Sequence, residues 1–122
     1  MTQSDFTKAS NTNSKIFKAL IKEKAVDKGK RSIVINGTFG GFGLSEKAYK
    51  KLGLTWDGYG YLFDKEKFRD CRVLVDVVKK LKGDADGAHA ELKVVVIPED
   101  VKWQLESYDG AEWIAEKHRI WR

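Results

Sequence analysis

The sequence is poor in cysteine, histidine, proline and long apolar runs. Its one cysteine, Cys71, cannot form an intrachain disulfide or a cysteine-based zinc site, and this scarcity is typical of a reducing compartment. No apolar run approaches the roughly 20 residues that cross a bilayer. The first residues have neither the basic nor the apolar region of a signal peptide. We therefore expect a cytoplasmic protein that makes no contact with a membrane.

Two histidines, His89 and His118, are too few to predict a metal site, and no motif predicts a cofactor. The chain also has no serine elbow of the hydrolase type. His118 with Glu112 or Glu116 could act as an acid–base pair, and an enzyme that uses His118, Glu112 and Asp109 is our third hypothesis. No catalytic residue is assigned.

The excess positive charge lies at the N-terminus. Residues 1–31 carry eight basic and three acidic side chains, whereas the rest of the chain carries fifteen of each. Residues 1–13, rich in Ser, Thr and Asn, are predicted to be a disordered tail. Residues 14–31 are predicted to form a basic amphipathic helix that stops near Gly29. It either packs on the domain or contacts a host protein or nucleic acid through Lys15–Arg31.

Residues 32–122 are predicted to form a single globular domain of the α+β (mixed α/β) class. We expect a small three- to four-stranded sheet packed against two or three helices. Ser32–Asn36 and Leu92–Ile97 are nearly continuous apolar runs, which predicts central strands. Alternating residues from Val101 to Leu105 predict a further strand, and the short connection favours its antiparallel pairing with the Leu92 strand.

Three helices are expected in this domain. The first runs from an N-cap at Ser45 to Gly53, and the second covers Arg72–Lys82 with Asp70 as its cap. Asp109 and Glu112 are spaced as in a capping box, which favours a third, short helix over residues 110–118. A closing strand is the alternative there. Residues 54–63, rich in aromatic side chains and glycine, are predicted to be a loop.

The chain has a glycine-rich stretch between its first apolar strand and the Ser45 helix. Residues 37–43 contain four glycines together with Phe39 and Phe42. Such a loop can gather N–H groups around an anion, or it can be a tight structural turn with both rings packed inward. It lacks the lysine of a P-loop and the third glycine of the dinucleotide fingerprint. Both interpretations therefore remain open.

Several short motifs resemble those of a known group of proteins. They are Phe-Gly-Gly-Phe-Gly-Leu-Ser at 39–45, Ile-Pro-Glu-Asp-Val at 97–101, Tyr-Asp-Gly at 108–110 and Glu-Lys-His-Arg at 116–119. In this order they resemble a family of small uncharacterised accessory proteins of bacteriophages and other large DNA viruses. The resemblance covers residues 32–121 and carries no catalytic assignment. It implies an accessory protein in the host cytosol, of the anti-defence kind that binds and disables a host component.

The leading hypothesis is a non-enzymatic protein that binds or sequesters a phosphate-bearing, nucleotide-like ligand, with a homo-oligomer as a possible arrangement. The glycine loop would receive phosphate, and Arg119 would present a fork to phosphate. The rings expected to stack on a base are those of Trp56, Tyr59 and Tyr61. The loop and the segment Tyr108–Trp121 are expected to lie together around one pocket. The expected ligand contacts are Gly37, Thr38, Phe39, Gly40, Gly41, Phe42, Ser45, Tyr59, Tyr61, His118 and Arg119.

Overall fold

The computed structural model describes residues 13–117, which fold as a mixed α+β domain with five antiparallel strands in two small sheets. The larger sheet has the order β1 (Val26–Asp27), β2 (Lys30–Asn36) and β3 (Leu92–Pro98). The second is a hairpin of β4 (Trp103–Tyr108) and β5 (Ala111–Glu116). The helices are a segment over residues 13–20, α2 (Glu46–Leu52), α3 (Arg72–Leu81), and the short 3₁₀ turns η1 (Glu66–Phe68) and η2 (Lys82–Ala85).

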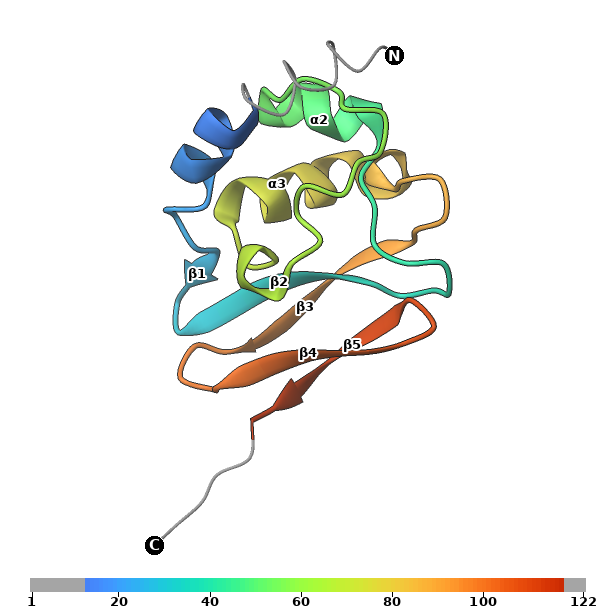
Figure 1. The fold of residues 1–122 in the computed structure, drawn as a ribbon. Coiled ribbons are helices and arrows are strands. Elements are labelled where there is room, and N and C mark those ends of the chain that lie inside the picture. The colour runs from blue at the N-terminus through green and yellow to red at the C-terminus, as the bar shows by residue number, and fades with distance from the viewer. Residues whose placement is uncertain (1–12, 118–122) are drawn as a thin grey trace, which may run out of the picture.

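The domain has three layers, with the β2–β3 sheet between the helices and the β4–β5 hairpin (Figure 1). Val34 belongs to the core beneath the helices, together with Leu74 and Val78 of α3. Ile33 and Ile35 are equally buried but point to the other face, where the hairpin lies. Because successive side chains of a strand alternate between faces, the run Ile33–Ile35 must be apolar throughout. The prediction of a strand buried on both faces is confirmed for β2.

Local signals set the ends of α2. The side-chain oxygen of Ser45 accepts a hydrogen bond from the N–H of Ala48, and Gly53 ends the helix in the left-handed conformation at φ 78°. Helix α3 also covers the predicted residues. Asp70, however, does not cap it: Cys71 holds the N-cap position without a side-chain bond. The Asp70 carboxylate instead pairs with Lys24 at 3.1 Å and Arg31 at 2.7 Å, because it faces β1 and β2.

The expected helix over residues 110–118 is wrong, and the alternative, a closing strand, is present as β5. Asp109 (φ 51°) and Gly110 (φ 89°) both adopt positive φ, as a two-residue hairpin turn requires. Tyr108 then faces Ala111 in the register of β4 and β5. The Asp-Gly pair thus directs a hairpin, which outweighs the capping-box spacing.

The expected pairing of the Leu92 strand with the strand after Pro98 is also wrong. β3 pairs with β2 and lies at the edge of its sheet, whereas β4 pairs with β5. The short connection between β3 and β4 carries the chain from the sheet layer to the hairpin layer (Figure 1). A short connection therefore joins two layers here rather than two neighbours in one sheet.

The basic N-terminal helix ends earlier than predicted. Helical structure covers residues 13–20, and β1 then pairs with the start of β2, Val26 facing Arg31. Phe17 is buried and meets Phe63 edge to face, so this segment belongs to the core. Of the predicted tail, only Asn13 is described, and its side-chain amide bonds both backbone groups of Thr55.

Candidate functional site

The glycine-rich residues 37–43 form a loop between β2 and α2, as predicted, and three other segments contact it. The N–H of Gly37 donates to Glu91 O at 2.8 Å, and the N–H of Leu44 donates to Gly60 O at 2.9 Å. The N–H of Gly40 donates to Asp109 O at 3.2 Å. We call the resulting cluster of residues 37–44, 57–61, 86–91 and 108–110 the loop end. Figure 1 shows the glycine loop, the loop before β3 and the β4–β5 turn side by side.

Close backbone packing explains the glycines at the junction with the hairpin. A Cβ on Gly110 would lie 2.3 Å from the Gly41 nitrogen and 2.8 Å from the Gly40 nitrogen. A Cβ on Gly40 would lie 2.8 Å from His89 O. Contacts this short are not compatible with a side chain, so Gly110 allows the hairpin turn to meet the glycine loop, and Gly40 allows the loop to meet His89. The expected proximity of the loop to the segment Tyr108–Trp121 is confirmed at its Tyr108–Gly110 turn, and a pocket between the two stays a prediction.

Four aromatic rings remain exposed on the loop end. The exposed fractions are 63% for Phe39, 62% for Tyr59, 57% for Tyr61 and 73% for Tyr108. The interpretation of the glycine loop as a turn with both rings packed inward does not hold for Phe39, because this side chain is exposed. Four large exposed rings on adjacent loops are the kind of surface that takes a planar or apolar ligand.

Phe42, in contrast, is buried and fills the inner side of the glycine loop. Its ring lies under the guanidinium of Arg69, with the Arg69 Cζ 3.7 Å from the ring centroid. Arg69 is itself fully buried and pairs with both oxygens of Glu112 on β5, at 2.6 and 2.9 Å. The remaining Arg69 donors reach the carbonyls of Phe63, Val34 and Asp64. Every donor of the guanidinium thus has an acceptor, as a buried charge requires.

This pair also completes the edge of β2. The Glu112 Oε1 atom accepts the N–H of Asn36 at 2.7 Å, and Arg69 donates to Val34 O at 3.3 Å. Side chains therefore take the place of a neighbouring strand at this edge. Arg69 did not stand out in the sequence, because a lone arginine in a polar segment carries no signal of burial. Glu112 stood out only as part of a capping box and as a possible partner of His118.

Asn36 ties the loop to both of its neighbours. Its side-chain amide donates to Thr38 O at 2.7 Å and Gly110 O at 2.8 Å, and its oxygen accepts the N–H of Glu91 at 2.8 Å. The side chain is fully buried, and these bonds pair its polar atoms. Asn36 therefore fixes the geometry of the loop end, a role that its place at the end of a predicted strand did not reveal.

The aromatic loop is held by Tyr49 and Asp57. The Tyr49 hydroxyl donates to Asp57 Oδ2 at 3.1 Å and accepts the N–H of Leu62. The other Asp57 oxygen accepts the N–H groups of Tyr59 and Gly60. Burial raises the pKa of Tyr49 well above its usual range. These bonds fix the backbone that carries Tyr59 and leave its ring facing solvent.

The structure thus brings most of the predicted site residues together, namely Gly37, Thr38, Phe39, Gly40, Gly41, Phe42, Ser45, Tyr59 and Tyr61. The Ser45 hydroxyl has a structural role, since it caps α2 and donates to Asp84 O at 2.6 Å. His118 and Arg119 lie outside the described residues. Lys93 is a basic side chain beside the loop: its Cδ and Cε lie 3.4 Å from the position of a Cβ on Gly37.

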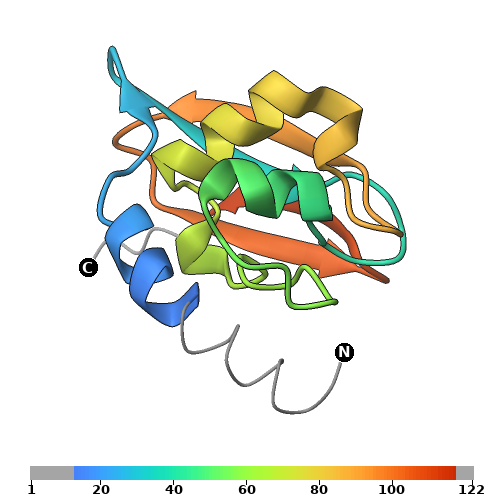
Figure 2. The ribbon, with the colours of Figure 1, turned by 90° about the horizontal axis from the view of Figure 1, so that it is seen from above.

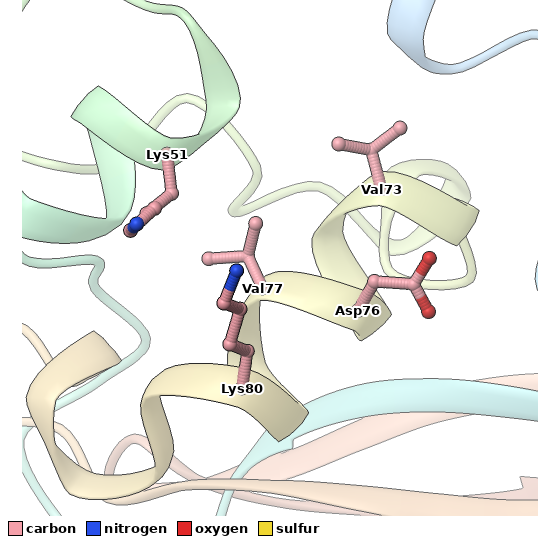
Figure 3. A pocket seen from close by; sticks show the side chains of 5 residues that line it. All are labelled: Lys51, Val73, Asp76, Val77 and Lys80. Carbon is pink, nitrogen blue, oxygen red and sulfur yellow. The ribbon is translucent and has the colours of Figure 1, made fainter.

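A separate hollow of about 200 Å³ lies between α2 and α3 (Figure 3). Val73 and Val77 form its apolar part, and Lys51, Asp76 and Lys80 surround it. It is smaller than common ligand pockets of roughly 300–1,000 Å³, and the Asp76 carboxylate points away from the Lys51 and Lys80 side chains (Figure 3). The hollow is therefore a weaker candidate than the loop end.

Three further observations limit the assignment. Comparison with known protein families, curated proteins and solved structures finds no match to this chain. Within residues 13–117, no group of three or more His, Cys, Asp or Glu side chains is placed to hold a metal ion. No helix in this part of the chain has the length and apolar character needed to traverse a bilayer. The geometry of the loop end is therefore the main indication of function.

Proposed function

We propose that this protein binds a planar, phosphate-bearing ligand of the nucleotide class at the loop end, and acts by sequestering it. The observation that carries the proposal is the exposure of four aromatic rings, one on the glycine loop and three on the two segments 57–61 and 108–110, which contact it. A base stacked on such a ring gains about 1–3 kcal/mol. The other supports are backbone donors and one cation.

The phosphate would lie toward Gly37 rather than Gly40. The N–H of Gly40 already donates to Asp109, and Gly110 covers the Gly41 nitrogen. The N–H groups of Thr38 and Phe39 have no acceptor among the described residues, and the Lys93 side chain lies beside Gly37. Two backbone donors and an ammonium group form a suitable environment for one phosphate.

The alternative from the sequence, a nucleic-acid or host-protein contact through Lys15–Arg31, has less support. Lys24 and Arg31 are paired with the buried Asp70 carboxylate, and Phe17 holds the helical segment in the core. Two of the basic groups are therefore engaged within the domain. The viral accessory role implied by the resemblance adds a context for sequestration, and it stays part of the proposal.

Titration calorimetry with purine and pyrimidine mono-, di- and cyclic nucleotides tests the proposal, with inorganic phosphate as a separate probe. We expect one nucleotide class to bind with a micromolar dissociation constant, and Tyr59→Ser and Tyr108→Ser each to weaken it about 5- to 100-fold. Val96→Ser is the matched control, because Val96 is 54% exposed on β3 and lies outside the loop end. The absence of heat with every nucleotide, or equal losses in the control, would refute the proposal.

A further inference from the structure

β3 is an edge strand with an apolar sequence and an open side. It is the last strand in the order β1-β2-β3, so β2 pairs with one side only (Figure 2). Its residues Val94, Val95, Val96 and Ile97 are all β-branched, and Val96 is 54% exposed. An exposed, regular strand edge of this kind readily pairs with another strand.

The hydrogen-bond directions identify the groups on the open side. In β2, the N–H of Ser32 donates to Ala25 O and that of Val34 to Arg69 O, so the even-numbered residues point away from β3. The odd-numbered residues therefore bond to β3, and Ile33 faces Val95. It follows that Val95 points its backbone groups toward β2, whereas Val94 and Val96 point theirs outward. The two N–H and two C=O groups of Val94 and Val96 have no partner within residues 13–117.

Both ends of this open stretch are closed. The N–H of Leu92 donates to Asp86 Oδ1 at 2.9 Å. At the other end, Pro98 has no N–H, and its carbonyl accepts the N–H of Val101 at 3.2 Å. The closed positions 92 and 98 lie at equal distances from Val95. The open edge is therefore symmetric about that residue.

We propose that a second copy of this chain pairs with β3, antiparallel, about a two-fold axis at Val95. Val94 of each copy faces Val96 of the other, and the two pairs exchange four hydrogen bonds. Leu92 of each copy faces Pro98 of the other. The ladder ends at these pairs, because the Leu92 N–H already donates to Asp86 and Pro98 has no N–H. The open edge and its closed ends are therefore complementary to those of a second copy. This complementarity favours self-association over binding of an unrelated peptide, whose free N–H groups would not end at the same positions.

The charges fit the same arrangement. Lys93 is the one charged side chain of β3, and it faces Ile97 of the second copy. The two Lys93 residues are then four positions apart, about 13 Å along the strand. This distance exceeds the Debye length of roughly 8 Å at physiological salt, so the like charges are screened. The paired sheet would continue as β1-β2-β3-β3-β2-β1 across the dimer.

Sedimentation equilibrium of the full chain tests the association. An edge contact of this size is weak, so the concentration should extend to about 1 mM. We expect the mass to rise from 13.9 kDa toward twice that value. Val96→Pro removes one outward N–H from each copy and should weaken dimerisation at least about tenfold. A mass of 13.9 kDa throughout, or a dimer that Val96→Pro does not weaken, would overturn the proposal.

Disulfide trapping tests the register and does not depend on the folding of the proline variant. Val95 faces Val95 of the second copy as a non-hydrogen-bonded pair, with Cα atoms about 4.5 Å apart, within reach of a disulfide. Val95→Cys should therefore form a covalent dimer under mild oxidation. Lys93→Cys is the control, because its two sulfurs would be too far apart, and the native Cys71 is fully buried. Equal crosslinking of both variants, or none of Val95→Cys, would overturn the proposed pairing.

Discussion

Replacing Glu112 by alanine should be among the most destabilising single changes in the domain. The side chains of Arg69 and Glu112 are 0% and 8% exposed, and Glu112 accepts from both terminal nitrogens of the guanidinium. The variant leaves a buried arginine whose remaining carboxylate contact within residues 13–117 is Asp64 at 3.3 Å. It also leaves the N–H of Asn36 without its acceptor.

The expected magnitude follows from these two losses. Breaking a buried ion pair by removing one partner costs about 3–5 kcal/mol. An unsatisfied buried N–H adds about 1–3 kcal/mol, although the two terms do not sum fully because the site can relax. We expect about 4–6 kcal/mol, a large part of the roughly 5–15 kcal/mol that stabilises a domain. Glu112→Gln keeps an acceptor for Asn36 and should be less costly by about 1–3 kcal/mol.

Urea unfolding, followed by circular dichroism, measures these free energies. A lower midpoint with an unchanged slope would report lost stability alone. Asp64→Asn is the matched control: it changes a carboxylate on the same guanidinium, but Asp64 is 60% exposed, so the cost should be below about 1 kcal/mol. If Glu112→Ala cost no more than Asp64→Asn, the Arg69–Glu112 pair would not hold the hairpin on the sheet.

Two further changes test the loop end. Gly110→Ala and Gly58→Ala both place a side chain at positive φ, 89° and 88°, but only at Gly110 would the Cβ meet backbone atoms. Thermal unfolding should therefore show a loss of stability that is larger for Gly110→Ala, by about 2 kcal/mol or more. Equal losses would mean that the hairpin turn does not press on the glycine loop. Because burial raises the pKa of Tyr49, the contribution of Tyr49 to stability should be constant below about pH 10, the pKa of an unfolded tyrosine, and fall as the pH rises above it. Tyr49→Phe should be less stable near pH 8 and show a weaker alkaline decline, and parallel pH curves for the two proteins would contradict this.

Sequence signals that act over a few residues predicted the corresponding elements. Ser45 and Gly53 set α2, the periodic apolar residues set α3, and the run Ile33–Ile35 set the buried strand β2. In each case the residue that carries the signal contacts its own element or the layer next to it. Local propensity and capping are therefore sufficient to predict these elements.

Signals that act between distant residues were missed or misread. Asp70 follows a helix-capping pattern, yet its carboxylate bonds Lys24 and Arg31, 46 and 39 positions away in the chain. Glu112 fits a capping box, yet it bonds Arg69. A carboxylate can satisfy either a helix end or a buried cation, and the choice depends on which group is desolvated in the folded domain. One sequence does not contain that information in local form.

The glycine loop illustrates the same limit at the candidate site. Glycines can free N–H groups for an anion or allow two backbones to touch, and both uses give the same residues. The Gly40–Asp109 bond and the contact of Gly110 with Gly41 show that the second half of the loop serves the hairpin. Any anion site is therefore restricted to the first half, near Thr38 and Lys93. Since Asn36 bonds Thr38 O, Gly110 O and the N–H of Glu91, the shape of that half depends on the hairpin, so ligand affinity should fall in variants that loosen it.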